Sequence, residues 1–166
     1  MLAIVKTQSL WRTLLVDAAM IGAACLMPAL SHLAALPLYK FNPMLVVLLG
    51  GMLLVNDRRN ALLMAVLLPA VSMLAVGMPV PAKAFCMAAE YLTVVLVSGW
   101  LLPRGAHFWG VAGAMLSAML CGKAVYYLLK AFVMAPAVLI GTSLCLQLGV
   151  ALAAALLYSL ISVNRK

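Results

Sequence analysis

The sequence predicts an all-α polytopic membrane protein, a six-transmembrane-helix bundle that forms a single transmembrane domain over residues 1–166. Of these residues, 68% are hydrophobic and only 8% are charged. Soluble domains are about 45–50% apolar and about 25% charged, so the polar groups of this chain are too few to cover a surface in water. Long apolar runs between short polar breaks indicate that the chain lies almost entirely in a lipid bilayer.

Six apolar runs account for most of the chain, and each predicts one helix because a span needs about 20 apolar residues. The runs cover residues 13–36, 44–55, 61–76, 82–102, 108–129 and 138–161. The second run is the shortest and reaches only about 18–21 Å at the helical rise per residue. We expect it either to tilt and continue through flanking residues, or to be a partly re-entrant element shielded by its neighbours.

Short polar or helix-breaking stretches separate the runs. The clearest is Gly-Met-Pro-Val-Pro, because prolines interrupt the hydrogen bonds of a helix. In chain order the breaks are 37–43, 56–60, 77–81, 103–105 and the stretch that begins near Lys130. The sequence contains no clear internal repeat and no charged soluble domain.

The basic residues predict how the helices are oriented. Six spans place seven of them on one side: Lys6, Arg12, Arg58, Arg59, Arg104, Arg165 and Lys166. The other side receives Lys40, Lys83 and Lys130. Because basic residues concentrate in cytoplasmic loops, we expect a multi-pass protein of the inner (cytoplasmic) membrane with both termini in the cytoplasm.

Several function classes are disfavoured by composition and motifs. The net charge of +8 comes from basic residues placed singly or in pairs between apolar runs, so we expect no nucleic-acid partner. The chain has two histidines, three acidic residues and none of the patterns HExxH, GxSxG or GxxxxGK[ST]. We therefore expect no enzyme, no catalytic residues, no cofactor and no metal site.

Glu90 and Lys123 are notable for their depth. Glu90 lies about seven residues into the fourth span and Lys123 about seven residues before the end of the fifth, so both lie roughly 10 Å below the same surface. A charge deep in a membrane costs about 2.5–3.5 kcal/mol or more unless it has a partner. We expect either an ion pair or a polar pocket that contains both residues. A purely structural pair, or a Lys123 side chain that extends to the surface, is the alternative.

The residues near this pair favour a ligand pocket. In the fourth predicted helix, Lys83 and Met87 share a face with Glu90, and Tyr91 is adjacent. In the fifth, Tyr127 and Lys130 share a face with Lys123. Small-ligand sites usually combine aromatic walls with a few placed polar groups. The alternative puts the tyrosines in the aromatic belt at the membrane surface, which explains Tyr126 or Tyr127 well and Glu90 poorly.

Three passages between residues 37 and 103 form a set. The first passage is Asn42-Pro43-Met44, which leads into Leu-Gly-Gly-Met-Leu-Leu (49–54). The second is Leu-Pro-Ala-Val-Ser (68–72), followed by Val-Gly-Met-Pro (76–79). The third is Met-Ala-Ala-Glu-Tyr (87–91), followed by Gly99 and Leu-Leu (101–102). Together they resemble the substrate-capture subunit (S component) of energy-coupling factor (ECF) vitamin transporters, in the group of folate, pantothenate and cobalamin carriers. Glu90 stands at the glutamate position of that family, whereas residues 56–60 stand where a glycine is common.

The resemblance implies a mechanism. An S component binds one vitamin-like molecule from outside, with the loops after its first and third helices closing the site. It then associates with a membrane coupling (T) subunit and two ATPase subunits and reorients to release the ligand inside. By the same resemblance, Ala19 and Ala23 are expected to meet the coupling subunit through an Ala-x-x-x-Ala pattern.

The expected ligand site combines the resemblance with the buried charges. It contains Lys83, Glu90, Tyr91, Lys123 and Tyr127, with Phe41 and Asn42 on the covering loop. In this hypothesis Lys83 or Lys123 neutralises an acidic ligand group, and Glu90 accepts hydrogen bonds or holds a lysine. A structural scaffold subunit of an envelope complex and a self-powered transporter that moves protons through Glu90 remain alternatives, and a membrane enzyme comes last.

Overall fold

The structure is a computed structural model that describes residues 2–33, 42–102, 107–133 and 144–164. All regular structure within these ranges is helical. The helices are α1 (Leu2–Leu33), α2 (Pro43–Val55), α3 (Arg58–Val76), α4 (Pro81–Leu101), α5 (Phe108–Val133) and α6 (Leu144–Asn164). Their order agrees with the six runs of the sequence. The prediction of an all-helical polytopic architecture is confirmed at this level.

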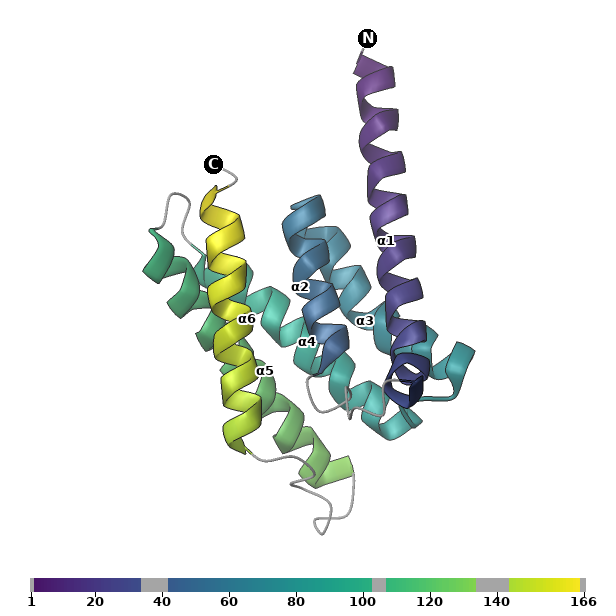
Figure 1. Cartoon of the computed structure of the whole chain (residues 1–166), viewed down its shortest axis with the longest axis vertical. Coiled ribbons are helices and arrows are strands. Elements are labelled where there is room, and N and C mark those ends of the chain that lie inside the picture. Colours follow the sequence, from purple (N-terminus) through teal and green to yellow (C-terminus); the bar gives the residue numbers. More distant parts are fainter. Residues whose placement is uncertain (1, 34–41, 103–106, 134–143, 165–166) are drawn as a thin grey trace.

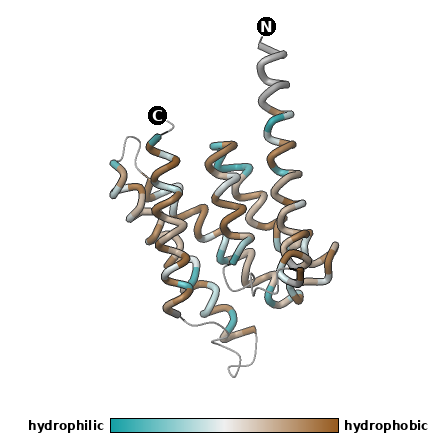
Figure 2. The backbone as a smooth tube through the Cα atoms, viewed as in Figure 1, coloured by the Kyte–Doolittle hydropathy of each residue, from teal (hydrophilic) through white to brown (hydrophobic). Residues whose placement is uncertain are grey.

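The described helices run alternately in opposite directions (Figure 1). The start of α1, the α2–α3 turn and the end of α6 lie at one end, which we call the arginine end because it carries Arg12, Arg58 and Arg59. The other end carries Lys83 in the first turn of α4 and Lys130 in the last turn of α5, and we call it the lysine end. Hydrophobic residues occupy most of each helix between the two ends (Figure 2).

Five of the described helices are long and apolar enough to cross a membrane, and α2 is the exception. The five candidate spans are Leu10–Met27, Arg58–Val76, Pro81–Leu101, Phe108–Val133 and Cys145–Asn164. The 13 residues of α2 extend only about 20 Å, against a hydrocarbon core of about 30 Å. Of the described helices, α2 is therefore the one that falls well short of that core.

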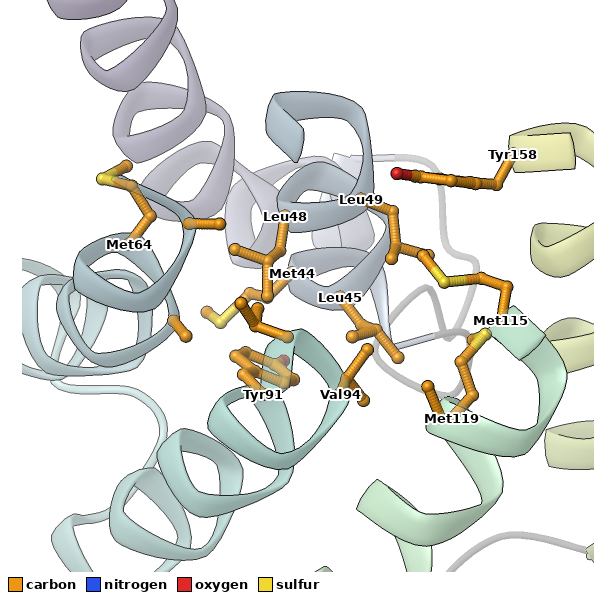
Figure 3. Close-up of a cluster of buried hydrophobic side chains, with 14 of the residues drawn as sticks. Met44, Leu45, Leu48, Leu49, Met64, Tyr91, Val94, Met115, Met119 and Tyr158 are labelled. Carbon is orange, nitrogen blue, oxygen red and sulfur yellow. The ribbon is translucent and has the colours of Figure 1, made fainter. Parts of the chain in front are cut away.

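The side chains of α2 form the centre of the hydrophobic core. Leu48 is fully buried, and Met44, Leu45 and Leu49 are nearly so. Figure 3 shows these side chains among others that come from the surrounding helices. The neighbours of α2 in this cluster are Met20, Met64, Tyr91, Val94, Met115, Met119 and Tyr158. One side of the short helix is thus shielded by its neighbours, whereas Val46 and Leu54 are exposed.

The tight turn between α2 and α3 is made by Asn56 and Asp57, and residues 58–60 of the polar stretch already belong to α3. Asn56 adopts a left-handed backbone with a φ of 53°, and its N–H donates to the carbonyl of Met52. Asparagine tolerates this conformation better than most residues other than glycine. Asp57 then caps α3, because its carboxylate accepts a 2.9 Å hydrogen bond from the Arg59 N–H. A non-glycine residue therefore makes this turn without losing the cap on either side.

Two polar contacts connect α1 to the turn region at the arginine end. The Asn60 amide donates to the Asp17 carboxylate at 2.8 Å, and the Arg12 guanidinium donates to the Leu54 carbonyl at 3.4 Å. Elsewhere much of α1 is uncovered, with Leu15 68% and Leu26 59% exposed. Because Arg12 lies level with the end of α2, the residues of α1 before it extend past the rest of the bundle (Figure 1).

Candidate functional site

A buried ion pair joins the middle of α4 to α5. Lys123 Nζ lies 2.8 Å from Glu90 Oε1, and the Glu90 side chain is only 1% exposed whereas that of Lys123 is 23% exposed. The expected pairing of these two residues is present. An uncompensated charge at this depth would be costly, so each residue provides the other with the partner that its position requires.

Gly122 allows the two helices to come close enough for this pair. A Cβ atom at position 122 would lie 2.7 Å from Val94 Cγ2 and 3.0 Å from the backbone oxygen of Glu90. The backbone of α5 is therefore nearly in contact with α4 at this level. Lys123 follows immediately, and from this position its side chain reaches the carboxylate of Glu90.

Asn42 connects the start of α2 to the same carboxylate. It is the N-cap residue of α2 and has a left-handed backbone, with a φ of 48° and a ψ of 58°, but its side chain makes no capping bond. Instead its amide donates to Glu90 Oε1 at 3.2 Å, and its side-chain oxygen accepts a 2.7 Å bond from the Tyr91 hydroxyl. An N-cap asparagine usually bonds to the backbone of its own helix; here both side-chain groups are used by α4.

Aromatic side chains of α5 extend the arrangement to α6. Lys123 Nζ lies 5.2 Å from the centre of the Tyr126 ring, within the range of a cation–π interaction. Tyr126 contacts Tyr127 edge to face with ring centres 5.5 Å apart. The Tyr127 hydroxyl donates to Gln147 Oε1 at 2.7 Å. We use the name polar cluster for Asn42, Glu90, Tyr91, Lys123, Tyr126, Tyr127 and Gln147.

One oxygen of the polar cluster is left without a donor. Glu90 Oε1 receives both the lysine and the asparagine, whereas Oε2 is buried and has no hydrogen-bond partner in the described part of the chain. Buried polar atoms are nearly always paired in folded proteins, and an exception commonly marks a site for a ligand, an ion or water. The cluster therefore presents an acceptor inside an otherwise apolar bundle.

The remaining expected residues lie in different places. Lys83 is exposed in the first turn of α4 and is close enough to Lys123 and Lys130 to interact with them electrostatically. Phe41 lies outside the described residues. On α1, Ala19 is exposed and Ala23 is half-buried, and neither belongs to the polar cluster.

Two members of the cluster, Tyr126 and Gln147, are absent from the expected site. A signal for Gln147 exists in the sequence, because it is an amide between leucines within the last span, where a polar side chain usually needs a partner. Tyr126 lies three residues after Lys123 and Tyr127 four, and both spacings bring a side chain near the lysine on a helix, so the choice of Tyr127 alone was too narrow. The contact with Lys123 identifies Tyr126.

No model of a known protein family, no curated protein and no solved structure matches this chain. The chemistry of the cluster is therefore argued from its own residues. A carboxylate, an ammonium group, amides and phenols offer donors and acceptors in apolar surroundings, which is the usual composition of a small-molecule site. Among the described residues, no group of three His, Cys, Asp or Glu side chains is arranged to hold a metal ion.

The Gly122 contact makes a prediction about packing. We expect Gly122→Ala to lower the free energy of unfolding by about 1–3 kcal/mol, the usual cost of overpacking, because its methyl group would meet the backbone of α4. Gly113→Ala is the matched control on the same helix, since a Cβ there has open space. Thermal unfolding in detergent measures both variants, and equal midpoints would contradict the close approach of α4 and α5.

The ion pair makes a second prediction, tested by a double-mutant cycle. Lys123→Met is expected to cost about 3–5 kcal/mol, because it leaves a buried carboxylate without its cation. Glu90→Gln should cost less, since the 23% exposed Lys123 can extend toward the surface. The double variant should be more stable than the sum of the two losses implies. Additive losses in thermal unfolding would show that the two charges do not stabilise each other.

Proposed function

We propose that this protein is the substrate-binding membrane subunit of an ECF-type ATP-driven importer, and that it captures a vitamin-like small molecule from the outer side. The single observation that carries the proposal is the polar cluster with its unpartnered Glu90 Oε2. A membrane protein that only fills space has no need of a buried carboxylate with a free oxygen, because such a group lowers stability. A solute that donates to this oxygen would satisfy it.

The proposal gives the bundle an orientation. We take six spans, with both termini and the arginine end in the cytoplasm, because basic residues concentrate on that side of a membrane. The lysine end then faces outward, and the polar cluster lies below it. The alternation of the described helices, with the beginning of α1 and the end of α6 at the arginine end, supports an even number of crossings.

The ligand-binding residues of the proposal are Phe41, Asn42, Lys83, Glu90, Tyr91, Lys123 and Tyr127. Their contacts suggest distinct roles. Glu90 provides the acceptor and Lys123 the nearby positive charge. Asn42, at the start of α2, donates to the carboxylate, and its own side chain is held by the Tyr91 hydroxyl of α4. Tyr127 holds α6 against the cluster through Gln147. A bound solute would therefore meet residues of three helices, α2, α4 and α5, with α6 held behind Tyr127.

The proposed partners are a membrane coupling subunit and two ATPase subunits. Their contact surface on this chain is assigned to α1, around Ala19 and Ala23. The support is that Ala19 is exposed in the described bundle and that Leu15 and Leu26 on the same helix are also exposed. Small residues at such a surface let a second helix approach closely within a membrane.

A second candidate function is proton-coupled transport through Glu90. The observation that favours it is the burial of this carboxylate at 1% exposure beside a lysine, because intramembrane acids commonly carry protons in transporters. The two functions differ in their energy source. Uptake into proteoliposomes driven by a proton gradient alone would select the second candidate.

The proposal predicts a tightly held small molecule. We expect the wild-type protein, purified in detergent, to release one class of solute when denatured, and mass spectrometry of that extract to identify it. Tyr127→Phe removes only a hydroxyl and should reduce the amount recovered by loosening α6 from the cluster. Leu63→Ala, at a 54% exposed position on α3, is the control and should retain the full amount. A wild-type protein that is empty, and that no extract stabilises against heat, would contradict solute capture.

A second prediction concerns the partner surface. Ala19→Trp places a large side chain at the proposed contact and is expected to prevent co-purification with co-expressed coupling and ATPase subunits. Ala153→Trp is the matched control, because Ala153 is also exposed but lies on α6. The small molecule should be retained by both variants. Equal recovery of the partner subunits with both would remove the assignment to α1.

A further inference from the structure

At the arginine end, the side chain of Arg58 lies against the backbone of α4. Arg58 is the first residue of α3, and a Cβ atom at Gly99 of α4 would lie 2.9 Å from its Nε and 3.0 Å from its Cζ. The guanidinium therefore occupies the space that a side chain at position 99 would take. Both residues are exposed, so the contact lies on the outer surface of the α3–α4 pair. We call this place the Gly99 notch.

The guanidinium in the Gly99 notch has donors to spare. A guanidinium has five N–H donors in a planar fork, and within the described part of the chain that of Arg58 makes no hydrogen bond or ion pair. Asp57 caps α3, Asp17 bonds to α3, and Glu90 is paired with Lys123. The sequence stretches outside the described residues contain no Asp or Glu. No acidic side chain of the protein is thus left for Arg58.

The surface of α4 beside the Gly99 notch is apolar. Leu96 lies three residues before Gly99, hence on the same helix face and about one turn nearer the middle of the bundle, and it is 46% exposed. Trp100 follows Gly99 and is 83% exposed. Because α4 is one of the five candidate spans, side chains exposed on it face lipid in a membrane. The charge of Arg58 therefore lies at the edge of a lipid-facing surface.

Tryptophans mark the arginine end as a boundary of the membrane. The chain has three, and all are exposed: Trp11 by 65%, Trp100 by 83% and Trp109 by 76%. Trp11 precedes Arg12, which reaches the end of α2, whereas Trp100 and Trp109 lie at the end of α4 and the start of α5. Tryptophan is enriched at the level of the lipid headgroups, because its ring is apolar and its N–H is polar. Three exposed indoles thus indicate that the Gly99 notch lies at headgroup level.

We propose that the Gly99 notch is a binding site for an anionic phospholipid, whose headgroup phosphate binds Arg58 and packs beside Trp100. Because the notch fixes the guanidinium, its planar fork can donate to two phosphate oxygens at once. The acyl chains then lie along the apolar surface at Leu96, which a free phosphate ion would leave uncovered. The inference goes beyond the proposed function and does not rest on it, since none of these residues belongs to the polar cluster.

The test compares the lipids that the protein retains. The full chain is reconstituted into nanodiscs with equal amounts of phosphatidylglycerol and phosphatidylcholine, extracted again in detergent, and its retained lipids are quantified by mass spectrometry. We expect the wild type to be enriched in phosphatidylglycerol. Arg58→Gln should lower this enrichment about three- to tenfold, the range for loss of one basic contact at an anionic membrane surface. A wild type that retains the two lipids equally would overturn the inference.

Matched variants distinguish a built site from general attraction by positive charge. Arg59→Gln removes the neighbouring exposed charge and should keep the enrichment. Gly99→Ala keeps every charge, but its methyl group would displace the guanidinium, which is the mobile end of a long side chain. The enrichment should therefore fall while the midpoint of thermal unfolding changes little. Gly22→Ala is the control, because a Cβ there has open space. Equal losses in Arg58→Gln and Arg59→Gln, or none in Gly99→Ala, would overturn the site.

Inorganic phosphate presents the same anionic chemistry without acyl chains, so it is added separately during extraction. Compared with sodium chloride at the same ionic strength, it should leave the amount of phosphatidylglycerol on the wild type unchanged. Displacement of the lipid by inorganic phosphate would show that the Gly99 notch binds the ion alone, and it would overturn the assignment to a phospholipid.

Discussion

The ion pair between Glu90 and Lys123 is the constraint on which the rest of the bundle depends. A carboxylate that is 1% exposed cannot remain charged in apolar surroundings without donors, so several helices are arranged to provide them. Gly122 brings α5 against α4, Lys123 provides the cation, and Asn42 adds an amide from α2. Changes in the packing of any of these helices alter the environment of one buried charge.

The short helix α2 connects this charge to the hydrophobic core. Its first residues follow Asn42, which bonds to Glu90 and Tyr91, while Leu48 lies in the middle of the core. Tyr91 belongs to both regions, because its ring is fully buried in the core and its hydroxyl donates to Asn42. The helix that falls short of a membrane's thickness therefore contributes four nearly or fully buried side chains to the core, and the residue at its start bonds to the polar cluster.

Hydropathy and the cost of buried charge predicted much of this architecture. Six apolar runs became six helices, and the pairing of Glu90 with Lys123 followed from their matched depth. Other features depend on the fold. The bond between Tyr127 and Gln147 joins residues 20 positions apart in different helices, and spacing within one helix cannot reveal it. The role of Gly122 was also hidden, since a glycine in an apolar run gives no sign of the backbone it faces. The extension of α1 before residue 13 was missed because span prediction follows apolarity, and this stretch includes Lys6, Gln8 and Arg12.

The contact at Gly122 also determines how the interior can be reached. Because the α5 backbone there lies almost on the α4 backbone, an acyl chain of the bilayer has no room to pass sideways between these two helices. At the level of Gly122, α4 and α5 therefore leave no opening between them. Any route toward the Glu90 carboxylate along these two helices would therefore have to run parallel to them.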